Sequence, residues 1–206
     1  MPTNHRLDPP RVLGILGGVG SGKSSLSGLL AEEGFVILDA DREAAQILDS
    51  AGMQPILEEL FGPQVLGPDG PRREKIAKAI FSDPPLRKRL EEAMHPRIRK
   101  TMLAELDAAL AQGRSVVLDV PLLLEGGLIE RCDRILFLEV PDPIREARVR
   151  ARGMSVQDWR RREAAQAPLS VKRSHADQIF DNSGSIEELR AQVRDWLRDE
   201  CGPSSD

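Results

Sequence analysis

An α/β fold with a parallel sheet is the fold class that the sequence predicts, on three observations. Short apolar runs without alternation, typical of strands that are covered on both faces, recur along the chain. Stretches with apolar residues at helical spacing lie between these runs. A glycine-rich loop joins the first run to the first helical stretch, so we expect a five-stranded parallel sheet between two helical layers, a three-layer arrangement. The runs are Val12–Leu16, 35–38, 116–118, 135–138 and 179–180.

The glycine-rich loop predicts a phosphate-binding site. It reads Gly17-Gly18-Val19-Gly20-Ser21-Gly22-Lys23-Ser24 and matches G-x-x-x-x-G-K-[ST] at every position. The glycines let the backbone curl so that its N–H groups point at phosphate oxygens, and the start of the following helix adds positive charge. Lys23 is expected to reach the β- and γ-phosphates, and the Ser24 hydroxyl suits Mg²⁺. The loop therefore predicts a P-loop NTPase fold, with a nucleotide bound by Gly17, Gly18, Gly20, Ser21, Gly22, Lys23, Ser24 and Ser25.

The helical stretches follow in order along the chain. Leu26, Leu29 and Leu30 form one apolar face after the loop, and a second face runs from Ile98 to Leu110. The last helix shows apolar positions at Ile186, Leu189, Val193, Trp196 and Leu197, and Ser185 with Glu188 forms a capping box at its start. We interpret these apolar faces as core.

The stretch between the second and third apolar runs is too long for one crossover helix. It covers about residues 42–113, holds several helical patterns and is interrupted by turn sequences such as Gly67-Pro68-Asp69-Gly70-Pro71. A helical insert fits this length better than a loop. We expect a single domain, with a core of about residues 11–200 that carries this insert.

Composition excludes several classes of function. The formal net charge of −4 argues against broad binding to nucleic acid, and no apolar run approaches the length of a membrane span. The first ten residues hold no apolar signal-peptide core, and Cys132 and Cys201 fit neither a disulfide framework nor a metal motif. We expect free thiols and a cytoplasmic protein without an obligate protein partner. Since no Ser/His/Asp or Cys/His constellation is visible, the sequence gives no support to hydrolase chemistry.

Carboxylates follow several strands at the edge where ligands of parallel sheets bind. Asp39 is the preferred general base for an attacking hydroxyl; its alternative is a cap of the next helix, for which Asp41 is the better candidate. Asp119 follows the third run in a Walker B-like pattern, so it either holds Mg²⁺ or bonds to a loop N–H. The other strand-end carboxylates are Glu139, Asp142 and Asp181.

Arginines are concentrated between Arg145 and Arg162. Arg148 and Arg152 share one helical face and could clamp a transferring phosphoryl group from a mobile lid of about residues 145–170. The alternatives are a solvated basic face or a nucleic-acid patch, and for Arg160 to Arg162 we favour a solvated face. His95-Pro96 fits a helix start, and spacing alone favours a structural role for His95.

Several further motifs carry a resemblance over roughly residues 11–196. The chain resembles the dephospho-CoA kinase family, whose phosphate loop, V-I-D-A-D, F-G with a D-G turn, V-F-x-D-P, H-P-x-I and P-L-L-F-E elements appear here in order. The matching segments are Gly17–Ser24, Ile37–Asp41, Phe61-Gly62, Asp69-Gly70, Ile80–Pro84, His95–Ile98 and Pro121–Glu125, followed by Gln166, Ala176-Asp177 and Asp181-Asn182.

The resemblance implies phosphorylation of the ribose 3′-hydroxyl of dephospho-CoA by ATP with Mg²⁺, the last step of coenzyme A synthesis. It implies a nucleotide core, a helical substrate-binding insert and an arginine-bearing lid. Asp39, Lys23 and Arg148 would be catalytic, and Asn182 would join the loop residues and Arg148 in binding ATP. The metal would be held by Ser24 and Asp119, and the acceptor by Asp41, His95 and Arg99.

Four positions depart from the family pattern. Leu16 replaces a usual Thr, Leu124 a Phe and Arg145 a frequent Gln. Arg152-Gly153 lacks the carboxylate of the usual Arg-Asp pair in the lid, which leaves the role of Arg152 open. Two other functions remain as alternatives: a kinase of the same architecture for another small hydroxyl compound or a nucleoside monophosphate, and a nucleotide-dependent switch. The chain lacks the N-K-x-D motif of GTPase switches, which argues against the last.

Overall fold

The computed structural model describes residues 7, 9–121 and 123–201, in two compact units. The first unit holds the chain up to Leu38 and from Leu106 onward, and the second holds Asp39–Glu105. Leu122 of the P-L-L-x-E element lies outside the described residues. Within the described ranges, no helix is both long and apolar enough to cross a membrane.

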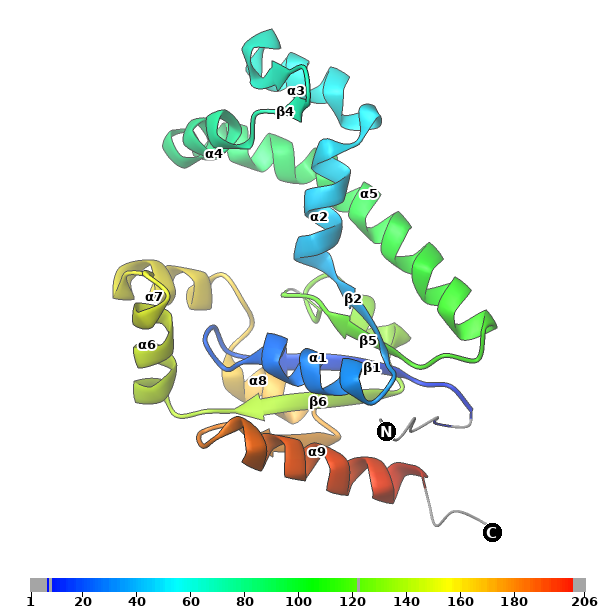
Figure 1. The fold of residues 1–206 in the computed structure, drawn as a ribbon. Helices are drawn as coiled ribbons and strands as arrows, with labels where there is room; N and C mark the ends of the chain where they lie inside the picture. The colour runs from blue at the N-terminus through cyan, green and yellow to red at the C-terminus, as the bar shows by residue number, and fades with distance from the viewer. Residues whose placement is uncertain (1–6, 8, 122, 202–206) are drawn as a thin grey trace. The chain divides into compact units, whose positions relative to one another are not determined.

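The first unit is built on a five-stranded sheet with the strand order β2-β5-β1-β6-β7 (Figure 1). β1 pairs in parallel with β5 and with β6, and β6 pairs in parallel with β7. All five predicted apolar runs are strands, and the predicted parallel α/β fold is confirmed. The strands are β1 (Val12–Gly17), β2 (Val36–Asp39), β5 (Val116–Asp119), β6 (Arg134–Glu139) and β7 (Gln178–Asp181).

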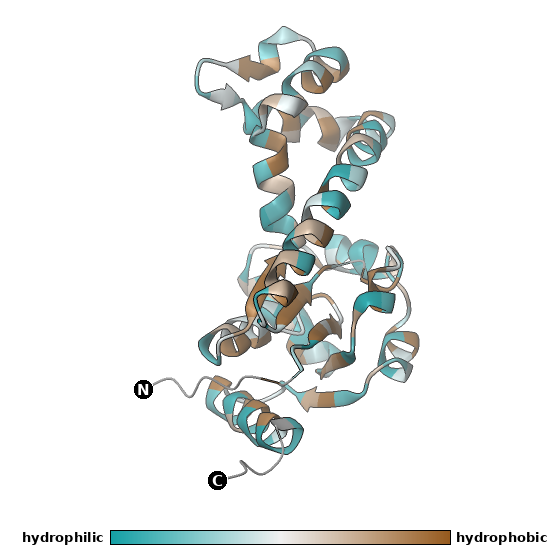
Figure 2. Cartoon of the chain, turned by 90° about the vertical axis from the view of Figure 1, so that its right-hand side faces the viewer, coloured by the Kyte–Doolittle hydropathy of each residue, from teal (hydrophilic) through white to brown (hydrophobic). Residues whose placement is uncertain are grey.

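Two helices, α1 (Lys23–Glu32) and α9 (Ile186–Cys201), pack against this sheet. Their leucines join alternate strand residues such as Leu13 and Ile15 in one buried cluster, because side chains two apart on a strand share a face. Figure 2 shows the apolar strands among helices whose ribbons mix apolar and polar residues. The predicted capping box is confirmed, since the Ser185 N–H donates to Glu188 and the Glu188 N–H donates to the Ser185 hydroxyl. The prediction that Ile186 is core is wrong: as the first residue of α9 it is 41% exposed.

Three helices connect β6 to β7 in the region where the sequence predicts a lid. They are α6 (Asp142–Ala151), α7 (Val156–Ala164) and α8 (Leu169–Ser174). α7 begins at a Ser155 cap whose hydroxyl accepts the Asp158 N–H. Its polar sequence is anchored by one apolar side chain, Trp159, which is completely buried.

The second unit is mainly helical and has its own apolar core. α2 (Ala40–Asp49), α3 (Gln54–Phe61) and α4 (Arg73–Ser82) surround a short hairpin of β3 (Leu66–Gly67) and β4 (Gly70–Pro71), with 3₁₀ turns at Ala51–Met53 and Pro63–Val65. The buried cluster contains Ile47, Met53, Leu57, Phe61, Val65, Ile76 and Leu90. A separate core explains why the stretch between β2 and β5 is a folded insert and not a loop.

The long helix α5 (Pro84–Ala111) corrects one expectation. His95-Pro96 does not start a helix, because Pro96 lies inside α5. A proline interrupts the backbone hydrogen bonds of its own turn. In α5 the Arg97 guanidinium donates to the Ala93 carbonyl at 2.6 Å, which supplies a side-chain hydrogen bond within that turn.

Candidate active site

The phosphate-binding loop leaves the end of β1 and closes at the start of α1. Gly20 and Gly22 have φ of 86° and 91°, the left-handed region that favours glycine. A Cβ on Gly20 would also lie 2.9 Å from the backbone carbonyl oxygen of Arg145, which cannot move aside as a flexible side chain could. The loop therefore needs glycine at Gly20 for both its conformation and its close contact with α6.

The start of α1 has donors available for an anion. Its N-cap residue is Gly22, which has no side chain that could cap the first turn. Within the described residues, the N–H groups of Gly20 and Gly22 donate to no acceptor, and the buried Ser21 hydroxyl has no partner. Amide groups at a helix start with the positive end of the helix dipole form an anion site, and the predicted phosphate-binding residues are thus placed together.

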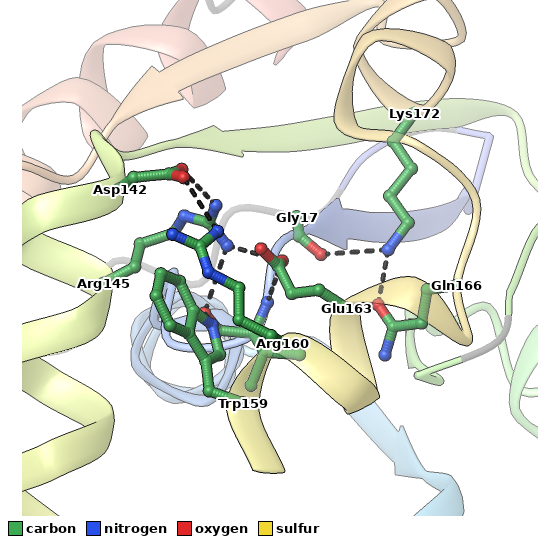
Figure 3. Close-up of polar contacts among 9 residues, drawn as sticks. Gly17, Asp142, Arg145, Trp159, Arg160, Glu163, Gln166 and Lys172 are labelled. Atoms are coloured by element: carbon green, nitrogen blue, oxygen red, sulfur yellow. Dashed lines mark hydrogen bonds and ion pairs between the residues drawn. The ribbon is translucent and has the colours of Figure 1, made fainter. Parts of the chain in front are cut away.

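Side chains from α6 and α7 hold the tip of the loop at Val19. Figure 3 shows three of them, Arg145, Trp159 and Glu163, close together. The Val19 N–H donates to Glu163 Oε1 at 3.1 Å. The Val19 carbonyl accepts from Trp159 Nε1 at 3.1 Å and from Arg145 Nη1 at 3.3 Å. Both backbone polar groups of Val19 are therefore bonded to the protein itself.

Arg145 is the centre of this contact and is only 1% exposed. Its guanidinium pairs with Glu163 and Asp142, each at 2.5 Å, and lies 5.3 Å from the centre of the Trp159 ring. Burial acts to lower the pKa of Arg145, but its hydrogen bonds to Glu163 and Asp142 outweigh burial and raise it. Arg145 is therefore a permanent cation that braces the loop.

The remaining arginines of the predicted lid differ in their surroundings. Arg148 lies in α6, is half-buried, and its Nη1 is buried with no partner among the described residues. Arg152 caps the end of α6 and is exposed. Arg160, expected to be a solvated arginine, is exposed but also stacks 4.2 Å above the centre of the Trp159 ring and pairs with Asp142 at 3.2 Å.

Asn182 follows β7 and lies against the loop. Its Nδ2 donates to the Ser21 carbonyl at 2.7 Å, and its side chain is buried. A Cβ on Gly22 would lie 2.4 Å from the same nitrogen. Asn182, which the sequence predicts to bind ATP, thus supports the loop backbone through its hydrogen bond to Ser21.

A cavity of about 390 Å³ opens beside the loop, at the carboxyl ends of β6 and β7. Its lining is mainly apolar and includes a few charged side chains. A mostly apolar cavity with a few polar groups is typical of small-molecule sites. The lining includes Gly18, Leu138, Val140, Leu169, Arg173 and Ser183.

The strand-end carboxylates have local partners. Asp119 ends β5, and its Oδ2 accepts from the Ser27 hydroxyl of α1 at 2.7 Å. Glu139 pairs with Arg173 at 2.8 Å. Asp181 accepts hydrogen bonds from Ser183, which lower the pKa of its carboxyl. In the described part of the chain, no three His, Cys, Asp or Glu side chains form a metal-binding group.

The other predicted site residues belong to the second unit. Asp39 caps α2: its Oδ1 accepts from the N–H groups of Asp41 at 2.8 Å and Arg42 at 3.2 Å. The expectation that Asp41 is the better cap is wrong, because β2 ends at Asp39 and the helix begins one residue later. His95 and Arg99 are both exposed on α5 and lie one helical turn apart.

Sequence reasoning missed three residues that the structure places at the loop: Trp159, Glu163 and Lys172. A buried tryptophan in a strongly charged helix was a usable signal, since large apolar side chains in such helices mark the packed face. Glu163 and Lys172 have no such signal, because their partners lie far away in the sequence.

Comparisons with known proteins agree with this geometry. The family model described as "Dephospho-CoA kinase" matches residues 11–188. A dephospho-CoA kinase of Enterococcus faecalis is 35% identical over 93% of this chain and 98% of its own length, and one of Deinococcus radiodurans is 40% identical over 92% of each chain. The crystal structure of TT1252 from Thermus thermophilus is 35% identical, with a TM-score of 0.72 over 91% of this chain and 96% of that one. The dephospho-CoA kinase of Campylobacter jejuni, 21% identical with a TM-score of 0.69 over 92% and 98% of the two chains, shares the fold.

Proposed function

The chain belongs to the dephospho-CoA kinase family, and from that premise we propose that it transfers the γ-phosphoryl group of ATP to the ribose 3′-hydroxyl of dephospho-CoA. The products are ADP and coenzyme A, so this is the final step of coenzyme A biosynthesis. The observation that carries the proposal is the family match over residues 11–188, which includes a complete phosphate-binding loop.

The loop and the adjoining cavity would bind the nucleotide. The N–H groups of Gly20 and Gly22 would donate to phosphate oxygens, and the Lys23 ammonium would offset their charge. The cavity beside Gly18 would take the base and ribose. Arg148, with a buried guanidinium nitrogen that has no partner in the described residues, would stabilise charge on the transferring group.

The donor set of the first unit fits Mg²⁺. The Ser24 hydroxyl lies in the first turn of α1, and the Asp119 carboxylate ends the strand that pairs with β1. Hydroxyl and carboxylate oxygens are the ligands that Mg²⁺ prefers. When bound, the ion would neutralise charge on the phosphates, with Ser24 and Asp119 holding it directly or through water.

Asp39 would act as the general base. Both hydrogen bonds that its carboxylate accepts from described residues go to Oδ1, and they fix its orientation. Oδ2 would take the proton of the 3′-hydroxyl as the new oxygen–phosphorus bond forms. Asp41, His95 and Arg99 would bind the acceptor. The imidazole of His95 and the guanidinium of Arg99 suit its phosphate groups, whereas the Asp41 carboxylate would accept hydrogen bonds from it.

Turnover of ATP with and without dephospho-CoA tests the proposal. The wild-type chain with Mg²⁺ should consume ATP only when the acceptor is present, and the product should have the mass of coenzyme A and carry the new phosphate on the 3′-oxygen by ³¹P NMR. A panel of nucleoside monophosphates and other small hydroxyl compounds serves as control. Faster turnover of any panel member than of dephospho-CoA would contradict the proposed substrate.

A further inference from the structure

Lys172 is a buried lysine behind the phosphate-binding loop, and the reaction as described above does not use it. It lies in α8 and is only 2% exposed. Its Nζ lies 3.4 Å from the Gly17 carbonyl oxygen and 2.5 Å from Gln166 Oε1 (Figure 3). Gly17 is both the last residue of β1 and the first residue of the loop, so Lys172 contacts the point where the loop leaves the sheet.

The charged groups around this ammonium come from several elements. Lys23 of α1 and Arg145 of α6 are cations, whereas Glu163 of α7 and Glu125 of the segment after β5 are anions. Burial lowers the pKa of Lys172, and repulsion from Lys23 lowers it further, against the smaller opposing effects of Glu125 and Glu163. Among the described residues, neither carboxylate lies within ion-pair distance of Nζ, and both hydrogen-bond partners of Nζ are neutral oxygens.

A buried charge without an ion-pair partner is costly, and this cost needs a compensating interaction. Two neutral acceptors compensate it only in part. A polyphosphate bound at the loop would bring several negative charges to the side where Lys23 lies, and in a partly desolvated site these charges act strongly on a nearby ammonium. The arrangement is therefore favourable with a polyphosphate bound and unfavourable without it.

We propose that Lys172 is a positioning residue for phosphoryl transfer: its ammonium holds the first carbonyl of the phosphate-binding loop and places a second positive charge, beside that of Lys23, behind the bound polyphosphate. The reaction that Lys172 would assist comes from the proposed function, whereas its position comes from its contacts with Gly17 and Gln166. It assigns Gln166 a role as well, since this side chain orients the ammonium toward Gly17. Lys172 acts through the loop and through its charge.

Replacing Lys172 by methionine tests the inference, because methionine keeps an apolar stem and removes the ammonium. For Lys172→Met we expect the Kd of Mg-ATP and the KM for ATP to rise about tenfold, and kcat to fall as well. The KM for dephospho-CoA should stay within about twofold of wild type, because the acceptor does not depend on this charge. The thermal midpoint should not fall, because a buried charge is removed. Lys172→Arg should recover part of the ATP affinity.

Two further variants make the result decisive. Lys78→Met removes one exposed positive charge on α4 and should leave ATP binding unchanged, which controls for net charge. Lys172→Gln keeps a hydrogen-bond donor for Gly17 without the charge, and serves if the methionine variant does not fold. ATP affinity within twofold of wild type in a folded neutral variant would overturn the inference, and so would failure of both neutral variants to fold. Equilibrium binding of Mg-ATP decides the role of Lys172 even if wild-type turnover of dephospho-CoA is absent, an outcome that would count against the proposed function alone.

Discussion

Removal of the Arg145 guanidinium should destabilise the first unit by several kcal/mol. Arg145→Met leaves the Glu163 carboxylate, whose side chain is only 18% exposed, without the cation that faces it at 2.5 Å. Breaking a buried ion pair by removing one partner costs about 3–5 kcal/mol. Asp142, the second partner, is half exposed and returns to water at a cost of only about 0–1 kcal/mol. Because Glu163 keeps some solvent contact, we expect a loss near the lower end of the range, about 3 kcal/mol.

A double-mutant cycle distinguishes the cost of leaving the Glu163 charge unpaired from the cost of lost packing around Arg145. Glu163→Gln in the Arg145→Met background removes the uncompensated charge and keeps a carbonyl oxygen that can accept the Val19 N–H. The double variant should therefore regain about 1–2 kcal/mol relative to Arg145→Met alone. The assay is urea unfolding, with the free energy of unfolding taken from the midpoint and slope.

Arg161→Met provides the matched control. Arg161 also pairs with a carboxylate, Asp158 at 2.7 Å, but its side chain is 70% exposed. Its removal should change the free energy of unfolding by less than about 1 kcal/mol. If Arg145→Met were equally mild, or if the double variant were no more stable than Arg145→Met, the assignment of Arg145 as a buried brace would be refuted.

Three other outcomes follow from the geometry. Asp39→Asn should lower turnover by roughly 10²–10⁴ while Mg-ATP binds normally by calorimetry, and near-wild-type turnover would rule out Asp39 as the base. Burial raises the pKa of the free Cys132 thiol to about 12, so a Cys201→Ser chain should react with iodoacetamide at pH 8 only after unfolding, and fast labelling of the folded chain would contradict this. Burial, and to a lesser extent repulsion from Glu105, raises the pKa of Glu43. The native state therefore binds this proton more tightly than the unfolded chain does, and stability falls as the pH rises above the pKa of glutamate in the unfolded chain, about 4.3. Glu43→Gln should therefore unfold at higher urea than wild type at pH 7 and converge with it near pH 4, and a difference independent of pH would show that ionisation is not the cause.

The features that the sequence predicted correctly are those that depend on residues close together in the chain. The glycines of the phosphate-binding loop, the apolar runs and the Ser185–Glu188 capping box each depend on neighbours within a few residues, and each has the predicted structure. Strand-end positions followed from these elements, because parallel strands bring their carboxyl ends to one edge. The sequence therefore sufficed for the sheet of the first unit and for the loop that leaves it.

The features that the sequence did not predict depend on contacts between segments that lie far apart in the chain. Arg145 and Arg148 lie three residues apart in one helix, yet one is buried against Trp159 and Glu163 of α7 and the other is not bonded to them. No periodicity distinguishes the two, since the partner helix determines which arginine is covered. The prediction that His95-Pro96 starts a helix failed for a related reason. α5 continues through Pro96, with buried residues on both sides of it at Leu90 and Met102.

Two sets of backbone groups in the phosphate-binding loop differ in their partners. One set is bonded to side chains from distant elements: the Gly17 carbonyl to Lys172, both polar groups of Val19 to the α6–α7 contact, and the Ser21 carbonyl to Asn182. The N–H groups of Gly20 and Gly22 belong to the other set, since neither donates to an acceptor in the described residues. The groups bonded to side chains alternate along the loop with the N–H groups of Gly20 and Gly22, which under the proposed function would face a phosphate. The loop is therefore held in shape by the protein itself, without a phosphate. Preorganised donors lose little entropy on binding and need little reorganisation during the reaction, so the supporting side chains should influence phosphate affinity without contacting the phosphate themselves.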